Sequence, residues 1–209
     1  MRPDVAAVLF DEPLTVIDPH LKWLLRRKLK EIHHELKLSL IYVTHDQVEA
    51  LTFADQVVVM TQGEVVQTGS AQALFEEPAH TFVGYFIGNP GMNLLPCDVK
   101  DGAAWVGGHA LALAGAAKAA LAGATGNITL GVRPEFVECV ADAGTGGDTV
   151  PATVLLVRNM GTHFLAEFRL GEQRVAAKLR AIDAAAGSTV HLRFPQQRTL
   201  YYVNDHRVA

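Results

Sequence analysis

The sequence has few cysteines, no long hydrophobic run and no excess of basic residues. Its two cysteines, Cys97 and Cys139, form no ligand pattern, so we expect them to pack as small apolar residues in a reducing compartment. The longest weakly polar stretch, residues 107–126, is interrupted by His109 and Lys118 and is too polar for a membrane span. The first residues lack the apolar stretch of a secretory signal, so we expect a cytoplasmic protein. Because 18 Lys and Arg stand against 22 Asp and Glu, the formal charge of −4 predicts no nucleic-acid partner.

Two further patterns have ordinary structural explanations. His33 and His34 are adjacent in a predicted helix and point in different directions, unlike the i, i+4 pair of a zinc site, so we expect no metal there. The basic run Arg26-Arg27-Lys28 beside Trp23 is typical of the solvated face of an amphipathic helix.

Charge and pattern both divide the chain near residue 90. Residues 1–90 carry 7 basic and 12 acidic side chains, a net charge of 7 − 12 = −5, whereas residues 91–209 carry 11 and 10, a net charge of 11 − 10 = +1. The segment Gly88-Asn89-Pro90-Gly91 ends a helix and turns the chain. The sequence therefore predicts two domains, residues 1–90 and residues 91–209.

The first domain has the pattern of a strand, a helix and a second strand. The apolar run Val5–Phe10 is typical of a strand buried on both faces, although its length alone also allows a helix. Asp18 and Pro19 are a good N-cap and first residue for an amphipathic helix that extends to about Lys37. The β-branched and aromatic run Leu40–Val43 predicts the second strand. Further along, residues 47–54 predict a short helix, residues 56–61 and 64–67 predict two strands joined through Gln62-Gly63, and short helices follow Ser70 and Thr81.

The second domain has no long helical pattern. Strand-like segments recur between glycine-rich turns, which favours a small β-barrel or sandwich. They cover residues 128–132, 150–157, 164–170, 174–179 and 189–194. The Ala- and Gly-rich segment 110–124 is compatible with a short helix or a loop.

Acidic side chains and a histidine follow the two predicted strands of the first domain. A right-handed crossover makes these strands parallel, so their carboxyl ends open on one edge of the sheet. Asp11 and Glu12 should therefore lie near His45. Two carboxylates at such a place offer one group to a metal and another to a water, while a histidine can reach a phosphate. Taken alone, Asp11-Glu12 is most simply explained as acidic residues where a buried strand emerges into solvent. The expected proximity of His45 makes a functional site at this edge more plausible.

These motifs resemble those of a known family. The segment Val8-Leu9-Phe10-Asp11-Glu12-Pro13 resembles the Walker B strand of ABC-transporter ATPases, Leu14–Asp18 resembles their D-loop, and Ile41–Asp46 resembles their switch-histidine loop. The segments Gln47–Leu51 and Gly88–Leu95 are similar to the carbohydrate-importer branch, which includes maltose and glycerol-3-phosphate systems. Gly131-Val132-Arg133-Pro134-Glu135 also fits the C-terminal OB-like regulatory domain of that branch.

The resemblance implies an α/β fold over residues 1–90, part of a P-loop-NTPase-like ABC ATPase domain, followed by an all-β OB-like regulatory barrel over residues 91–209. It implies that Asp11 helps to hold Mg²⁺ through water, that Glu12 orients or deprotonates the water attacking the γ-phosphate of ATP, and that His45 contacts that phosphate. Asp18 would lie at the interface with a second ATPase subunit. Membrane-spanning permease subunits would be further partners, at the inner face of the cell membrane.

Several family motifs are missing from these 209 residues. There is no Gly-x-x-x-x-Gly-Lys-Ser/Thr phosphate-binding loop, and the Leu-Ser-Gly-Gly-Gln signature and the glutamine loop are also absent. The leading interpretation is therefore a shortened form of the ATP-hydrolysing subunit of an importer, inactive alone. The alternative is a non-catalytic regulatory, dimerisation or small-ligand-binding module. The sequence does not name the transported solute.

Overall fold

The computed structural model describes residues 7–140 and 147–209, in two units that divide within residues 58–74. The first unit comprises the chain up to Val58 together with residues 68–73, and the second comprises residues 59–67 and 74–209. The second unit thus takes in residues that the sequence pattern places before residue 91. Within the described ranges, no helix combines the length and the apolar character that crossing a membrane requires.

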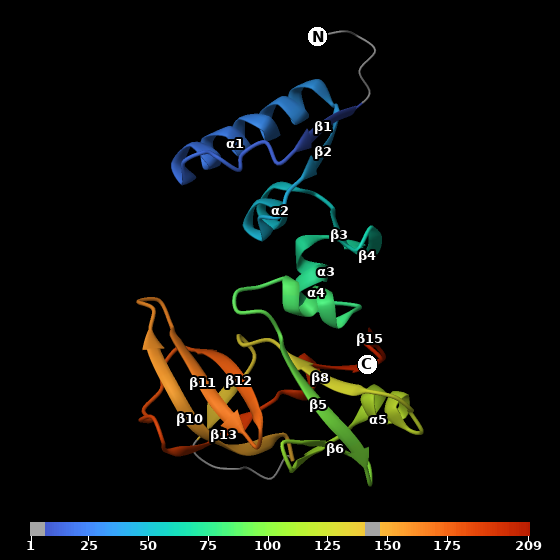
Figure 1. The fold of residues 1–209 in the computed structure, drawn as a ribbon, viewed down its shortest axis with the longest axis vertical. Coiled ribbons are helices and arrows are strands. Elements are labelled where there is room, and N and C mark those ends of the chain that lie inside the picture. Colours follow the sequence, from blue (N-terminus) through green and yellow to red (C-terminus); the bar gives the residue numbers. More distant parts are fainter. Residues whose placement is uncertain (1–6, 141–146) are drawn as a thin grey trace. The chain divides into compact units, whose positions relative to one another are not determined.

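A strand, a crossover helix and a parallel strand form the first unit (Figure 1). Strand β1 (Ala7–Asp11) pairs in register with β2 (Ser39–Val43), and α1 (Pro19–Leu36) connects them. The Asp18 carboxylate caps α1 by accepting the His20 backbone N–H at 2.8 Å, and the helix ends where Lys37 adopts a left-handed conformation. Both ends therefore agree with the sequence prediction, whereas Val5 and Ala6 of the predicted first strand lie outside the described residues.

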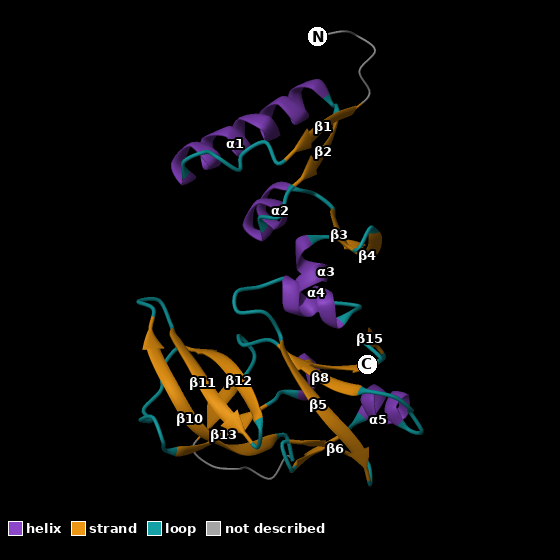
Figure 2. Ribbon diagram, viewed as in Figure 1, coloured by secondary structure: helices purple, strands orange, loops and turns teal. Residues whose placement is uncertain are grey.

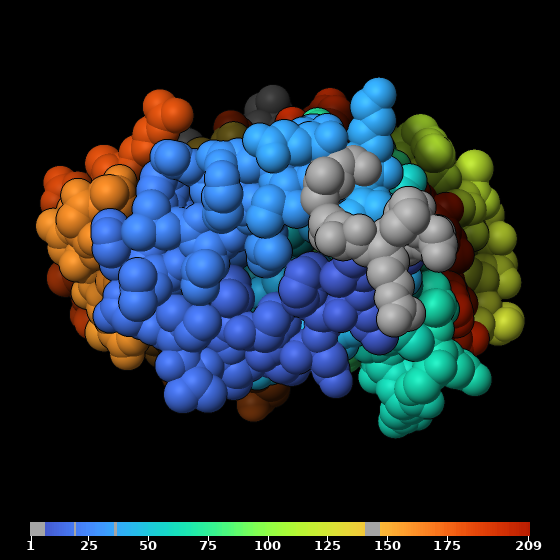
Figure 3. Space-filling model, turned by 90° about the horizontal axis from the view of Figure 1, so that it is seen from above, coloured from blue at the N-terminus to red at the C-terminus, as the bar shows by residue number. Residues whose placement is uncertain are grey.

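The two-stranded sheet of the first unit is covered on one face only. Phe10 and Tyr42 point to the covered face, where their ring centroids are 6.3 Å apart, and the Phe53 ring of α2 (Gln47–Phe53) lies 5.2 Å from the Tyr42 ring. On the opposite face Leu9 is 65% exposed and Ile41 is 55% exposed. The apolar pattern of these strands is typical of burial on both faces, but within the described residues α1 and α2 supply only one covering layer and the other face stays exposed. Figure 3 shows one face of this unit, on which the residues of α1 appear in blue.

A hairpin and two short helices come next along the chain, as the sequence predicts. Strands β3 (Val57–Thr61) and β4 (Glu64–Gly69) are joined by Gln62 and Gly63, which both have positive φ, as a tight two-residue hairpin turn requires. Helices α3 (Ala71–Glu76) and α4 (Thr81–Phe86) follow.

The second unit is built from two antiparallel sheets around one core (Figure 2). The five-stranded sheet has the order β12-β11-β10-β13-β9, and the six-stranded sheet has the order β15-β14-β8-β5-β6-β7. The strands of the first sheet are β9 (Glu138–Val140), β10 (Thr149–Asn159), β11 (Phe164–Leu170), β12 (Gln173–Leu179) and β13 (Thr189–Arg193). Those of the second are β5 (Asn93–Lys100), β6 (Ala103–Val106), β7 (His109–Ala112), β8 (Ile128–Val132), β14 (Thr199–Val203) and β15 (His206–Arg207). A short α5 (Gly115–Leu121) and a 3-10 turn (Gln196–Arg198) also belong to this unit.

Alternating side chains of both sheets fill the core of the second unit. Phe168 and Leu192 of one sheet and Leu130 of the other are fully buried in the same apolar cluster. The predicted strands at 128–132, 150–157, 164–170, 174–179 and 189–194 are all present, with ends shifted by no more than two residues. The Ala- and Gly-rich segment 110–124, which the sequence left open, begins as the end of β7 and continues as α5.

The side chain of Asn93 joins the two sheets. Its Oδ1 accepts the Ala176 N–H at 2.7 Å, and its Nδ2 donates to the carbonyl oxygens of Ala176 at 2.9 Å and Val132 at 3.1 Å. Ala176 lies in β12, the edge strand of the five-stranded sheet, and Val132 lies in β8 of the other. The Lys178 N–H also donates to the Pro134 carbonyl at 2.8 Å. These bonds satisfy an edge that would otherwise expose unpaired backbone groups.

Candidate functional site

Glu12 lies directly after β1, at the edge of the sheet where the chain turns. Its backbone N–H donates to the Val43 carbonyl at 2.9 Å, which continues the β1–β2 pairing by one residue. Its φ is 46°, a left-handed conformation that residues other than glycine seldom adopt and that is frequent at functional sites. The turn out of β1 therefore aims the Glu12 side chain along the edge of the sheet.

The structure brings Glu12 and His45 together, as the crossover argument predicts. Glu12 Oε1 is 2.5 Å from His45 Nδ1 and accepts the His45 backbone N–H at 3.2 Å. Glu12 Oε2 accepts the Thr15 hydroxyl at 2.8 Å. Both carboxylate oxygens are thus engaged, and among the described residues His45 Nε2 makes no hydrogen bond and stays open to a ligand.

The contact between Glu12 and His45 shifts the pKa of both side chains. The pKa of Glu12 lies below its ordinary 4.5, chiefly because the His45 side chain hydrogen-bonds to it and secondly because Thr15 does. The pKa of His45 lies above its ordinary 6.5, chiefly because of the hydrogen bond to Glu12. Both side chains are accessible to solvent, so water and salt screen the charge interaction. Glu12 is therefore ionised at neutral pH and suited to holding a water or a proton donor in place.

Asp11 and Asp18, the other acidic residues of the predicted site, have separate positions. Asp11 is the last residue of β1; because side chains alternate along a strand, it points to the exposed face opposite Phe10. Asp18 is the N-cap of α1, with its carboxylate on the His20 N–H. No hydrogen bond between either carboxylate and the Glu12–His45 pair is present in the described structure. Residues 7–140 and 147–209 also contain no group of three or more His, Cys, Asp or Glu side chains arranged to hold a metal ion.

Sequence reasoning missed Glu49, a carboxylate beneath the His45 turn. Its side chain is only 3% exposed and lies at the start of α2. Glu49 Oε1 pairs with Lys22 Nζ of α1 at 3.1 Å, and Oε2 accepts the hydroxyls of Tyr42 at 2.9 Å and Thr44 at 3.3 Å. Burial, followed by the Glu49 hydrogen bond, raises the pKa of Tyr42 well above its ordinary value. The sequence signal was available, since an acidic residue three positions after the N-cap Asp46 is typical of a helix start.

A second buried charge, whose burial the sequence does not predict, lies in the barrel unit. Arg133 is 1% exposed, and its guanidinium donates to the carbonyl oxygens of Phe75 at 2.9 Å, of Gly84 at 2.9 Å and of Ile87. It also lies 4.3 Å from the centroid of the Phe75 ring. Arg133 thereby binds α3 and α4 to the end of β8, which is why the second unit begins before residue 91. Gly131 permits the close approach, because a Cβ there would lie 2.7 Å from Met92 Sδ and Tyr202 Cε2.

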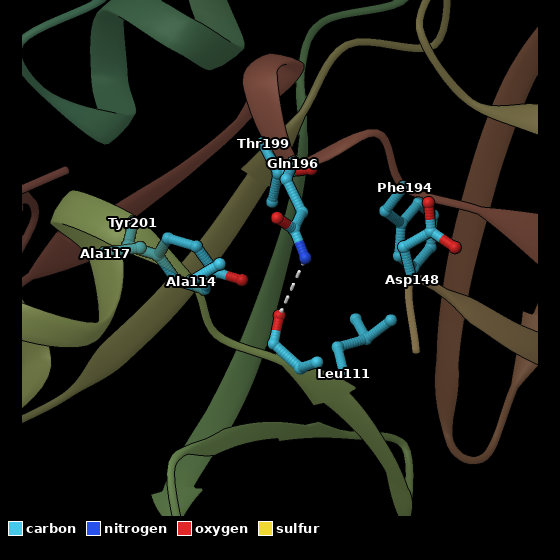
Figure 4. Close-up of a pocket in the computed structure, with 9 residues that line it drawn as sticks. Leu111, Ala114, Ala117, Asp148, Phe194, Gln196, Thr199 and Tyr201 are labelled. Atoms are coloured by element: carbon cyan, nitrogen blue, oxygen red, sulfur yellow. Dashed lines mark hydrogen bonds between the residues drawn. The ribbon is translucent and has the colours of Figure 1, made fainter. Parts of the chain in front are cut away.

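The barrel unit also has a small pocket, shown in Figure 4. It is lined by residues that include Leu111, Phe194 and Tyr201, and Gln196 Nε2 donates across it to the Ala112 carbonyl at 3.4 Å. Its volume of about 30 Å³ is room for about one water molecule. Pockets for small organic ligands are roughly ten times larger, so this one does not accommodate such a ligand in the described conformation.

Comparison with known proteins finds two domain models and a set of curated relatives that this chain resembles. The MalK OB fold domain model matches residues 88–137, and the TOBE domain model matches residues 130–201. The chain is 40% identical over 203 residues to the sn-glycerol-3-phosphate import ATP-binding protein UgpC of Salmonella typhi, across 94% of this chain. The UgpC proteins of Escherichia coli O157:H7 and Yersinia pestis bv. Antiqua are 39% and 37% identical over 93% and 96% of the chain. The chain is homologous to the C-terminal part of these import ATP-binding proteins.

The UgpC homology extends over both units, whereas the two domain models lie in the second. The chain spans about 55% of the length of the curated relatives that it matches. The solved structure of the cytoplasmic molybdate-binding protein ModG covers 54% of this chain and 95% of its own, with a TM-score of 0.43 and 12% identity. That likeness is too slight to support any conclusion about this UgpC homologue.

Proposed function

We propose that this chain supplies the C-terminal part of an ATP-hydrolysing subunit that drives import of a carbohydrate, polyol or glycerol-3-phosphate. The observation that carries the proposal is the hydrogen-bonded pair of Glu12 and His45 at the carboxyl ends of two parallel strands. This edge is where ligands of open α/β sheets bind. The homology to UgpC proteins, whose name states ATP binding and import, supports the same function.

In this proposal Glu12 orients the attacking water and His45 holds the γ-phosphate. Glu12 is suited to orientation because its lowered pKa keeps it ionised. His45 Nδ1 is held by Glu12, which leaves Nε2 for a phosphate oxygen, and its raised pKa favours the charged form that attracts an anion. Phosphoryl transfer needs mainly such positioning and charge stabilisation from the protein.

Asp11 is the residue of this chain that would hold Mg²⁺, through water. Asp11 fits that mode because its carboxylate is exposed at the carboxyl end of β1, and because Mg²⁺ keeps several waters and commonly takes only one or two carboxylates together with substrate phosphates. When bound, the ion would neutralise charge on the phosphates of ATP. Asp18, at the exposed start of α1, is the proposed contact with a second ATPase subunit.

The bare face of the β1–β2 sheet supports an assembly larger than the described residues. Parallel strands are normally covered on both faces, yet Leu9, Ile41 and Val43 are 65%, 55% and 47% exposed. We propose that the rest of an ATPase domain of the UgpC type covers this face. The remaining partners would be membrane-spanning permease subunits, which would place the protein at the cytoplasmic side of the cell membrane.

The first test is the coding sequence upstream of residue 1. An in-frame Gly-x-x-x-x-Gly-Lys-Ser/Thr loop is expected roughly 120 to 150 residues earlier, a distance set by the size of such a domain. In that longer protein, Glu12→Gln should retain ATP binding while turnover falls at least about a hundredfold, the scale of losing a general base. Glu35→Gln, an exposed carboxamide substitution on α1, is the matched control and should leave turnover unchanged. Equal turnover in the two variants would remove Glu12 from this role.

A second candidate function is a non-catalytic regulatory or dimerisation module. It is favoured by the absence of a phosphate-binding loop from the 209 residues and by the location of both domain models in the barrel unit. If no such loop lies upstream, this function replaces the first. In either case the 209-residue chain alone should not bind ATP at micromolar concentration, because each missing charge-assisted bond is worth about 1.5–3 kcal/mol. Micromolar binding measured by calorimetry would contradict that expectation.

A further inference from the structure

Glu49 is a buried carboxylate in a place where packing alone would favour an apolar side chain. Removing a charge from water is costly, and an apolar residue of similar size often stabilises a fold as well or better. Glu49 is 3% exposed, but both of its oxygens are engaged, by Lys22 on one side and by Tyr42 and Thr44 on the other. The three partners come from α1, from β2 and from the turn after β2. Glu49 therefore fixes three elements relative to the start of its own helix.

The turn that Glu49 holds is the one that carries His45. Thr44 Oγ1 donates to Glu49 and at the same time accepts the Asp46 N–H at 3.0 Å. The Asp46 carboxylate accepts the backbone N–H groups of Val48 at 2.9 Å and Glu49 at 3.2 Å, and it lies 3.8 Å from Lys22 Nζ. The residues on both sides of His45 are thus tied to the same network, while the His45 side chain itself is 74% exposed.

The link to Glu12 passes through the backbone as well as through the imidazole. The His45 N–H donates to Glu12 Oε1, the oxygen that also meets Nδ1. A shift of the turn would therefore break two contacts at once, and no packing around the exposed imidazole would restore them.

We propose that Glu49 is a positioning residue for the Glu12–His45 pair. Through Thr44 and the cap of α2 it sets the place of the His45 backbone and hence the orientation of the imidazole toward Glu12. Its consequence for ATP turnover rests on the proposed function, whereas its effect on His45 is a property of this chain and can be measured without nucleotide.

The test follows His45 in the 209-residue chain by NMR. The imidazole ¹⁵N resonances report the hydrogen bond at Nδ1, and amide exchange reports the bond from the His45 N–H. Thr44→Val, which keeps the shape but removes both hydroxyl bonds, should move the Nδ1 resonance to the position of a free histidine and speed amide exchange at His45 about tenfold. Glu49→Gln should act in the same direction, and Thr44→Ser, which restores the hydroxyl, should return both signals.

Thr52→Val is the matched control for Thr44→Val. The Thr52 hydroxyl donates within α2 to the Val48 carbonyl, and no hydrogen bond from it to Glu49 is present among the described residues. This variant should leave both His45 signals unchanged. Tyr42→Phe, which removes one hydrogen bond from Glu49, provides a milder perturbation if Glu49→Gln does not fold.

Two results would overturn the proposal. One is a folded Thr44→Val or Glu49→Gln chain with lower thermal stability but unchanged His45 signals, which would make Glu49 a structural residue only. The other is an equal response to Thr52→Val. Failure of the proposed function is a separate outcome: normal turnover of Glu12→Gln in the longer protein would refute hydrolysis by this site while leaving the NMR coupling of Glu49 to His45 intact.

Discussion

Replacing Arg133 with methionine should destabilise the barrel unit far more than replacing another arginine that lies over an aromatic ring. Arg133 is buried, donates to the backbone carbonyl groups of α3 and α4, and lies over the Phe75 ring. Methionine fills part of the volume but donates no hydrogen bond. The carbonyl groups would remain buried without their donor, which is the costly half of breaking such a contact.

The magnitude follows from the contacts and from the price of burying the charge. Three hydrogen bonds from a charged donor contribute about 1.5–3 kcal/mol each, or about 5–9 kcal/mol together, and the fourth, to Leu74 at 3.4 Å, adds little. Burial lowers the pKa of Arg133 from 12.5 to about 10. The lowered pKa reflects the cost of burying the charge, which opposes the hydrogen bonds by about 3 kcal/mol. The balance is a loss of roughly 4 kcal/mol, a large part of the stability of an ordinary domain.

Urea unfolding measures the loss, with Trp105 fluorescence as the reporter in a Trp23→Phe background, so that only the barrel unit is observed. Arg198→Met is the matched control, because Arg198 lies 4.7 Å from the Phe136 ring centroid but is 48% exposed and should cost less than about 1 kcal/mol. Both pKa values of Arg133 exceed 9, so it is charged in the folded and unfolded chain below that pH and the loss should not vary between pH 6 and pH 8. An equal, small effect of the two substitutions would refute this account of Arg133.

Three further predictions concern titration, exchange and reactivity. By NMR, the His45 imidazole should titrate above pH 6.5, and Glu12→Gln should lower its pKa, because the hydrogen bond to Glu12 is the largest cause of the shift. The contribution of the pair to folding stability is lost as the pH falls through the lowered pKa of Glu12 and as it rises through the raised pKa of His45. An unshifted titration in the unchanged chain would contradict the hydrogen bond. Amide exchange should be faster in β1 than in β10, because one face of β1 is bare. If that face pairs with another copy of the chain, exchange in β1 should become slower as the protein concentration rises. Equal protection in a monomer would indicate that β1 needs no cover. Burial raises the pKa of the Cys97 thiol to about 11, so Cys97 should react with a disulfide reagent at pH 8 at least about tenfold more slowly than free cysteine, and a fast reaction would contradict its burial.

Local features of the fold were predictable because their causes lie within a few residues. Asp18 and Pro19 start α1 through a side-chain cap and a fixed φ, and the Gln62-Gly63 turn closes its hairpin through positive φ. The approach of Glu12 to His45 was also predictable, because the handedness of a strand, helix and strand unit leaves one arrangement. Their catalytic roles remain predictions.

Some elements of the barrel escaped prediction because their stability depends on neighbours distant in the sequence. Strand β5 carries Pro96 and charged residues and is recognisable only from its pairing with β6 and β8. The short β15 exists because it pairs with β14. Such strands have no independent signal, since β-propensity largely reflects the surface against which a strand packs.

The sequence by itself determined the order of the elements, their caps and turns, and the meeting of Glu12 with His45. Only the tertiary structure decided which charges are buried. Glu49 and Arg133 resemble surface residues in the sequence, yet one holds the turn of His45 and the other holds two helices against the barrel. The exposed face of β1 and β2 is the reverse: its apolar residues resemble core residues in the sequence, yet no segment of the described structure covers them. The physical reason is that desolvation depends on every segment that surrounds a side chain, and those segments are brought together only by the complete fold.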